Sequence, residues 1–132
     1  MSRTLRPWAP AVLWAAALFA VSARATLPID LHSGSDKLAH FGAYLILGLA
    51  LGFARVRTGA SFYIVLALGV LYGASDEFHQ SFVPGRSADV ADWIADSLGV
   101  LSGLLLHHAW SRARRRSRAA ERMIAGDPIP ND

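Results

Sequence analysis

The chain carries a compact group of polar side chains between two strongly apolar stretches. Its members could exchange protons, hold a cation or hold an anion, and they are Asp76, Glu77, His79, Gln80 and Arg86. Ionisable groups beside hydrocarbon are costly, so such a group at a membrane edge indicates a functional site. Val83-Pro84-Gly85 is expected to end the preceding helix, because proline disfavours helix at the residue before it and glycine permits a turn.

A second polar group opens the apolar stretch that follows residue 35. Asp36, His40 and Tyr44 are four residues apart, so in a helix they lie along one stripe. Lys37 falls close to Tyr44 around the same helix. The stripe favours polar groups that face the other helices, although an acid at the helix start and a hydrogen-bonded histidine would also explain it.

A third polar group begins the last apolar stretch. Ser87 is a suitable N-cap. Asp89, Asp92 and Asp96 follow at helical spacing and therefore share one face. Asp96 would lie one to two turns inside the membrane edge, where an acid must be protonated, paired or solvated by an internal cavity.

Four apolar segments must position these groups, at about residues 8–23, 38–54, 60–75 and 90–110. The chain has 132 residues and is 53% hydrophobic and 17% charged, against about 25% charged in ordinary soluble domains. A spanning helix needs about 20 residues, so the second and third segments need their flanks. The sequence predicts an all-α bundle of four transmembrane helices over residues 8–110 and a basic, flexible cytoplasmic tail over residues 111–132.

The first segment has an alternative interpretation as a signal peptide. Arg3 and Arg6 precede an alanine-rich core, and Ala23-Arg24-Ala25 imitates a small-residue cleavage site. An uncleaved helix is favoured because Arg24 sits inside the proposed site. In either case the chain is expected to emerge on the outer side at Asp30.

The distribution of Lys and Arg predicts the orientation, since cytoplasmic connections are enriched in them. The second connection carries Arg55 and Arg57, whereas the third carries only Arg86. The C-terminal segment carries a run of arginines: Arg112, Arg114, Arg115, Arg116, Arg118 and Arg122. Both termini are therefore predicted to be cytoplasmic, with residues 36–40 and 76–92 on the outer face.

Three glycine pairs at four-residue spacing bear on packing: Gly48 and Gly52, Gly69 and Gly73, and Gly99 and Gly103. Small residues at this spacing allow membrane helices to approach closely. The pairs predict a tight bundle, and they also offer glycine-rich faces for a homo-oligomer.

Composition narrows the partners and cofactors. The clustered arginines could suggest nucleic acid, but base-stacking aromatic residues are not interleaved with them, so membrane lipids are the predicted partners and nucleic acid is not. The absence of cysteine excludes disulfides and thiolate chemistry. A divalent metal held by His40, His79 and carboxylates is an open alternative, and no other cofactor is predicted.

Residues 36–103 resemble the VanZ-like membrane proteins. The motifs that carry the resemblance are Asp36-Lys37-Leu38-Ala39-His40-Phe41 with Tyr44, Tyr72-Gly73-Ala74-Ser75-Asp76-Glu77-Phe78-His79-Gln80, Phe82-Val83-Pro84-Gly85-Arg86-Ser87, and Asp92-Trp93-Ile94-Ala95-Asp96-Ser97-Leu98-Gly99 with Gly103. The resemblance implies a small multi-pass protein of the bacterial inner membrane and cell envelope with an outward-facing polar site. The family's namesake is associated with low-level resistance to the glycopeptide antibiotic teicoplanin. Family members usually carry asparagine where this chain has Asp96.

The leading functional hypothesis is an outward-facing site that binds or modifies a lipid-linked or cell-wall anionic group. Glu77, His40 and Asp76 are the candidate catalytic residues, because they could exchange protons. The candidate ligand-binding residues are Asp36, Lys37, Tyr44, His79, Gln80, Arg86, Asp92 and Asp96. Arg86 would hold the anion or clamp Asp76 or Glu77.

Two alternatives come from other functional classes. The chain could be a small proton-coupled transporter in which Asp96, His40 and Asp76 relay protons. It could also be a non-catalytic membrane interaction or assembly factor whose polar groups only join the helix ends. Whether the chain is an enzyme at all is left open by its residues.

Overall fold

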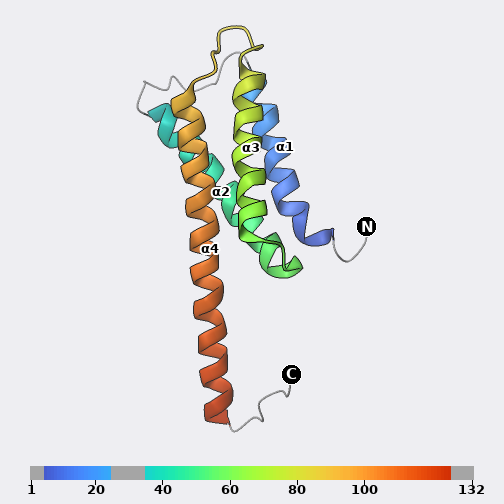
Figure 1. The fold of residues 1–132 in the computed structure, drawn as a ribbon, viewed down its shortest axis with the longest axis vertical. Coiled ribbons are helices and arrows are strands. Elements are labelled where there is room, and N and C mark those ends of the chain that lie inside the picture. The colour runs from blue at the N-terminus through green and yellow to red at the C-terminus, as the bar shows by residue number, and fades with distance from the viewer. Residues whose placement is uncertain (1–4, 25–34, 126–132) are drawn as a thin grey trace.

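The computed structural model describes residues 5–24 and 35–125, and every regular secondary-structure element in them is a helix. A 3-10 turn, η1 (Arg6–Trp8), leads into α1 (Ala9–Ser22), α2 (Ser35–Thr58), α3 (Phe62–Gln80) and α4 (Val90–Ala125) (Figure 1). The predicted all-α fold class is therefore confirmed. Arg3, Ala25 and Asp30, on which the signal-peptide alternative and the predicted exit point depended, lie outside the described residues.

Two of the described helices, α2 and α4, are long and apolar enough to cross a membrane. The flanks of the second apolar segment join it, so that α2 reaches 24 residues. In α3 the flanks supply polar side chains: its last two turns contain Asp76, Glu77, His79 and Gln80. The residues that flank the apolar stretches therefore have two roles: they lengthen the helices, and they include the polar side chains that could take part in chemistry.

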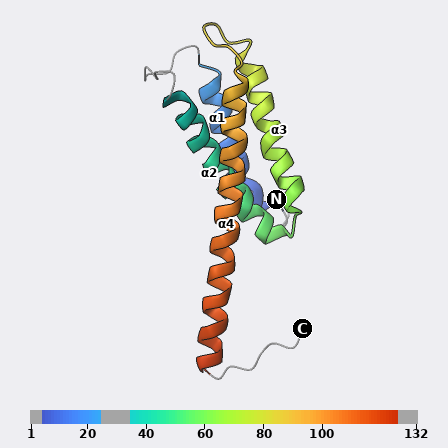
Figure 2. The same ribbon diagram turned by 60° about the vertical axis from the view of Figure 1, so that its left-hand side comes forward.

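Helix α4 continues well past its predicted end near Trp110. Residues 111–125, expected as a tail, continue the helix, and from Arg112 onward they are exposed. This stretch is rich in alanine and arginine, which favour helix, and it has no proline or glycine to break one. Figures 1 and 2 show this part of α4 projecting alone beyond the other helices.

Close contact between α2 and α4 forms the centre of the bundle. A Cβ atom added at Gly99 would collide with the Phe41 carbonyl oxygen, and one at Gly103 would collide with the Leu45 carbonyl oxygen. All six glycines of the three pairs are buried. The pairs therefore allow the close packing that was predicted for them, and within one chain their faces are already covered. Self-association stays a prediction.

Hydrogen bonds from two half-buried aromatic side chains join helix α1 to α2 and α3. The Trp14 indole donates a hydrogen bond to the Ala43 carbonyl oxygen at 2.8 Å. The Tyr72 hydroxyl donates to the Ala15 carbonyl oxygen at 2.6 Å. Both aromatic rings also pack against the apolar core around Leu47, as buried Trp and Tyr commonly do when their polar atom finds a partner.

The connection between α3 and α4 closes one end of the bundle (Figure 1). Gly85 has a φ of 81°, the left-handed conformation that glycine adopts without strain. The Arg86 backbone N–H then donates to the Val83 carbonyl oxygen at 3.1 Å. The predicted break at Val83-Pro84-Gly85 is confirmed, and it turns Arg86 back toward the helices.

Candidate functional site

Three helices bring their polar groups to the end of the bundle where α3 connects to α4. The start of α2, the end of α3 and the start of α4 meet there, as the antiparallel order of the helices requires (Figure 1). We call this group the polar cluster, and its members are Asp36, Lys37, His40, Tyr44, Asp76, Glu77, Gln80, Arg86, Asp89, Asp92 and Asp96.

Lys37 joins the start of α2 to the start of α4. Its Nζ atom lies 2.9 Å from Asp89 Oδ2 and 2.8 Å from Asp92 Oδ1. Asp92 is buried and Asp89 is exposed, so the ammonium mainly compensates the carboxylate of Asp92. The hydrogen bond from Lys37 also lowers the pKa of the exposed Asp89 carboxyl below its ordinary value.

His40 lies between the carboxylates of α3 and α4. Its Nδ1 atom is 3.0 Å from Asp96 Oδ1 and 3.9 Å from Glu77 Oε1. Asp96 is only 1% exposed, and its second oxygen has no hydrogen-bond partner in the described part of the chain. A buried acid next to an imidazole is a pair that can pass a proton between its members.

Gln80 separates Arg86 from the acids of α3. The amide oxygen accepts hydrogen bonds from Arg86 Nε at 3.1 Å and from Arg86 Nη2 at 2.9 Å. The amide nitrogen donates to Glu77 Oε1 at 3.3 Å and faces Asp76 Oδ2 at 3.5 Å. Among the described residues no carboxylate lies within ion-pair distance of Arg86. Arg86 therefore does not clamp an acid of α3, which was one of the two predicted roles for this side chain.

The two acids at the end of α3 have different partners. Asp76 Oδ2 accepts a hydrogen bond from the Tyr44 hydroxyl at 3.1 Å. Glu77 Oε2 accepts one from the Asp89 backbone N–H at 2.8 Å. Adjacent residues on a helix point in different directions, so Asp76 faces α2 while Glu77 binds the segment that leads into α4.

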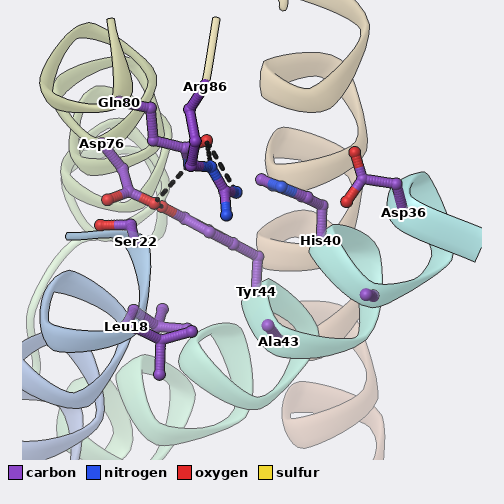
Figure 3. Close-up of a pocket in the computed structure, with 11 residues that line it drawn as sticks. Leu18, Ser22, Asp36, His40, Ala43, Tyr44, Asp76, Gln80 and Arg86 are labelled. Carbon is purple, nitrogen blue, oxygen red and sulfur yellow. Dashed lines mark hydrogen bonds between the residues drawn. The ribbon is translucent and has the colours of Figure 1, made fainter. Parts of the chain in front are cut away.

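A cavity of about 110 Å³ opens beside the polar cluster. Figure 3 shows His40 and Tyr44 from α2, Asp76 and Gln80 from α3, and Arg86 around it. Its apolar wall comes from α1 and α2 and consists of Leu18, Val21, Ala39 and Ala43. The cavity is therefore amphipathic: its polar side carries Arg86 and His40 together with the acids Asp36 and Asp76, and its other side is aliphatic.

Two overlapping sets of side chains could hold a divalent cation. His40, Glu77 and Asp96 form one set, and Asp36, His40 and Asp92 form the other; within each set the ligand atoms lie within 4.8 Å of one another. Imidazole and carboxylate together suit several divalent transition metals. His40 belongs to both sets, so its imidazole could serve only one of the two candidate cation positions at a time.

The structure separates His79 from these sets. Its ring stacks on Phe19 of α1, with the centroids 4.4 Å apart, and neither set contains it. Asp89, in contrast, was not among the predicted site residues, although it bonds Lys37 through its side chain and Glu77 through its backbone. The signal for Asp89 was its helical spacing to Asp92, which places the two acids together opposite one lysine.

Two described helices that are long and apolar enough to cross a membrane, together with the family match given next, support a small helical membrane protein. The chain belongs to the VanZ/LLP1 family, whose profile matches residues 5–111. It is similar to uncharacterized protein C11E3.10 of Schizosaccharomyces pombe, with 33% identity over 90 residues. That match covers 67% of this chain and 54% of the yeast protein, so the chain spans about half the length of this relative. No solved structure matches the chain.

Proposed function

We propose that this protein is a multi-pass protein of the bacterial inner membrane whose polar cluster binds the anionic group of a lipid-linked or cell-wall compound. All four helices would span the membrane, with both termini in the cytoplasm and the polar cluster on the outer face. The positions of Arg55, Arg57 and the arginine run support this orientation, because they lie at the ends of helices away from the cluster. A role in glycopeptide resistance is part of the same proposal.

The pairing of Arg86 is the observation that carries the proposal. Its guanidinium is held by a neutral amide rather than by a carboxylate. Gln80 therefore fixes the direction of the side chain without cancelling its charge. A planar guanidinium that is oriented and not neutralised suits phosphate or carboxylate oxygens, and it lines the cavity where such a group would enter.

The apolar wall of the cavity supports an amphiphile as the ligand. Leu18, Val21, Ala39 and Ala43 face the same space as Arg86. A compound with both a charged head and an acyl or polyprenyl chain would use both sides of the cavity. A fully polar solute would leave the aliphatic wall without a partner.

His40 is the group best placed for proton exchange with a bound anion. It lines the same cavity as Arg86, and Asp96 holds its ring through the 3.0 Å contact at Nδ1. Glu77, 3.9 Å from the same nitrogen, offers a second carboxylate. Any acid–base chemistry at this site would therefore run through His40, with Glu77 or Asp76 as the alternate proton carrier.

Binding of a polyprenyl phosphate to the purified protein in nanodiscs tests the proposal. The uncharged polyprenol of the same chain length is the comparison ligand. Arg86→Ala should weaken phosphate binding by about tenfold or more, because charge-assisted hydrogen bonds are lost, and Arg86→Lys should retain part of it. Arg57→Ala, which removes an exposed arginine away from the polar cluster, is the control.

The melting temperature of each variant must be measured beside its affinity, because Arg86 also completes the bonds of Gln80. Equal affinity for the phosphate and the alcohol would overturn the proposal. The proposal would also be overturned if Arg86→Ala and Arg86→Lys both bound the phosphate as tightly as the wild type, with the melting temperature of Arg86→Lys unchanged.

Proton-coupled transport is a second candidate, favoured by the buried His40–Asp96 pair. Asp96 is almost fully enclosed, and one of its oxygens has no partner in the described part of the chain. Asp96→Asn keeps the shape of the side chain and removes its proton-carrying group. Reconstituted vesicles should show proton uptake driven by an imposed potential in the wild type and not in this variant, and uptake no faster than in empty vesicles would reject transport.

A further inference from the structure

A second cavity, of about 350 Å³, lies at the other end of the bundle. It forms where the turn between α2 and α3 meets the middle of α4. We call it the basic cavity, and its lining consists of Arg55, Val56, Gly59, Ala60, His108, Ser111, Arg112 and Arg115. The polar cluster and the basic cavity share no residue.

Among the described residues, the lining of the basic cavity contains no acidic side chain to balance its arginines. In the sequence, no Asp or Glu occurs in residues 37–75 or in residues 97–120, which include every part of α2, α3 and α4 that contributes to this lining. Three arginines thus face one space, and the stretches of helix that bear them contain no carboxylate. Among the described residues of the lining, no carboxylate is present to pair with them, so an added anion could supply the counter-charge.

Arg55 is the arginine of this cavity with a buried donor that lacks an acceptor in the described part of the chain. Its Nε atom is buried and has no hydrogen-bond partner among the described residues. The guanidinium lies 5.6 Å from the centre of the Phe62 ring, which stabilises the cation but offers no acceptor oxygen. A buried N–H without an acceptor is costly, so an acceptor from a ligand is expected here.

The α4 side of the cavity is a single helical face. His108, Arg112 and Arg115 follow one another at spacings of four and three residues, so their side chains project in the same direction. Arg112 and Arg115 are exposed and Arg55 is half-buried. A ligand between these arginines would enter from the solvent or the membrane surface. It would contact Arg112 and Arg115 at the entrance and Arg55 further inside.

Exposed aromatic and aliphatic side chains near the cavity support a position at a membrane surface. Tyr63 is 80% exposed and Ile64 is 62% exposed at the start of α3. Trp110 is exposed on α4, and the Arg114 guanidinium lies 4.5 Å from the centre of its ring. Exposed Trp and Tyr beside arginines are typical of the interface between hydrocarbon and head groups.

We propose that the basic cavity binds the phosphate of an anionic phospholipid head group. Arg55, Arg112 and Arg115 supply the charge, and the exposed apolar start of α3 contacts the acyl chains. Basic pockets between membrane helices are suited to such head groups. This site needs the protein to lie in a membrane, but it is independent of whether Arg86 binds any ligand.

Native mass spectrometry of the detergent-solubilised protein, with phosphatidylglycerol, phosphatidylcholine or inorganic phosphate added, tests this site. The test variant is Arg112→Gln with Arg115→Gln. The matched control is Arg116→Gln with Arg118→Gln, which removes the same charge from the same exposed stretch of α4 but not from the lining. Wild type and control should retain phosphatidylglycerol at least about tenfold more tightly than the test variant.

Each other outcome overturns the proposal in a recognisable way. Equal retention of phosphatidylglycerol and phosphatidylcholine would exclude recognition of the anionic head group. Equal losses in the two double variants would show attraction by the whole arginine run rather than a site. Inorganic phosphate that binds as tightly as phosphatidylglycerol would assign a free-anion site instead of a lipid site.

Two further measurements keep the result interpretable. Arg55→Gln should also weaken phosphatidylglycerol retention, and its melting temperature should rise less than that of the wild type when this lipid is added. Binding of the polyprenyl phosphate that depends on Arg86 should be unchanged by Arg112→Gln with Arg115→Gln. A failure at one site is thereby distinguished from a failure at the other.

Discussion

The two ends of the helix bundle handle charge in opposite ways. At the polar cluster, Lys37 and Arg86 are fewer than the acids, which are Asp36, Asp76, Glu77, Asp89, Asp92 and Asp96. Most of these acids accept hydrogen bonds from residues of another helix or connection. At the basic cavity Arg55 has an aromatic neighbour, Phe62, and the described lining contains no acid. The polar cluster is held together by hydrogen bonds and ion pairs within the protein, whereas the charge of the basic cavity is left for solvent or a ligand to balance.

This difference indicates that the polar cluster needs more exact side-chain geometry than the basic cavity does. Four of the acids in the polar cluster are buried, and a misplaced buried charge costs far more than an exposed one. The basic end tolerates looser geometry at Arg112 and Arg115, because both are exposed and keep their hydration. We therefore expect substitutions at the polar cluster to disturb the fold and the site together, and substitutions at the basic end to change binding alone.

The largest effect should come from forcing apart the helices that build the polar cluster. Gly99→Val would push α4 away from α2, because a side chain at this position meets the Phe41 carbonyl and the Leu45 backbone nitrogen. Overpacking of this kind costs about 1–3 kcal/mol or more. Denaturant titration in detergent micelles measures it, with Gly42→Ala, where a Cβ meets nothing within 4 Å, as the control. Equal stability of Gly99→Val and wild type would refute the tight crossing.

The next effect should come from Gln80, which is 3% exposed and connects Arg86 to both acids of α3. Gln80→Ala leaves these partners without their amide and should cost about 1–3 kcal/mol of stability. Gln80→Glu places a carboxylate against Arg86 and should abolish binding of the polyprenyl phosphate. Undiminished phosphate binding by Gln80→Glu would contradict the role given to the uncompensated guanidinium.

The metal alternative gives a prediction that separates the two histidines near the end of the bundle. Any stabilisation of the protein by Mn²⁺ or Zn²⁺ should be lost in His40→Ala and kept in His79→Ala, because only His40 belongs to the candidate ligand sets. A cation present at 100 times its dissociation constant adds about 2.7 kcal/mol. Thermal unfolding with and without the metal measures this, and loss in His79→Ala alone would place the ligands elsewhere.

The smallest effect should come from the exposed Lys37–Asp89 pair. Since Lys37 lowers the pKa of Asp89 in the folded protein, this pair contributes stability above the ordinary aspartate pKa of about 3.9. The contribution is lost as the pH falls through the lowered value. Wild type should therefore melt slightly above Asp89→Asn at neutral pH, and the gap should close in acid. A gap that widens in acid would contradict the pair.

The sequence predicted which residues gather at the polar cluster better than it predicted their partners. Asp36, His40 and Tyr44 lie on one stripe because helical spacing alone sets that. Arg86 bonds Gln80 instead of an acid because the path of the α3–α4 connection decides its reach, and no local pattern encodes that path.

Two other departures have equally local causes. His79 faces Phe19 of α1, since each step along a helix turns the side chain by about 100° and directs it away from its neighbour Gln80. Residues 111–125 continue α4 because nothing in them breaks a helix before Gly126, whereas the prediction had ended the helix where the apolar residues end. Hydrophobicity sets how far a helix lies in a membrane, but backbone preference sets how far the helix itself runs.

The placement of the two ends on opposite sides of a membrane is the claim that most of this account depends on. The chain has no cysteine, so single-cysteine variants report one position each. Ser87→Cys, beside the polar cluster, should react with a membrane-impermeant maleimide in intact cells, and Ser117→Cys, in the arginine run, should react only after permeabilisation. Labelling of both positions in intact cells, or the reverse pattern, would contradict the account.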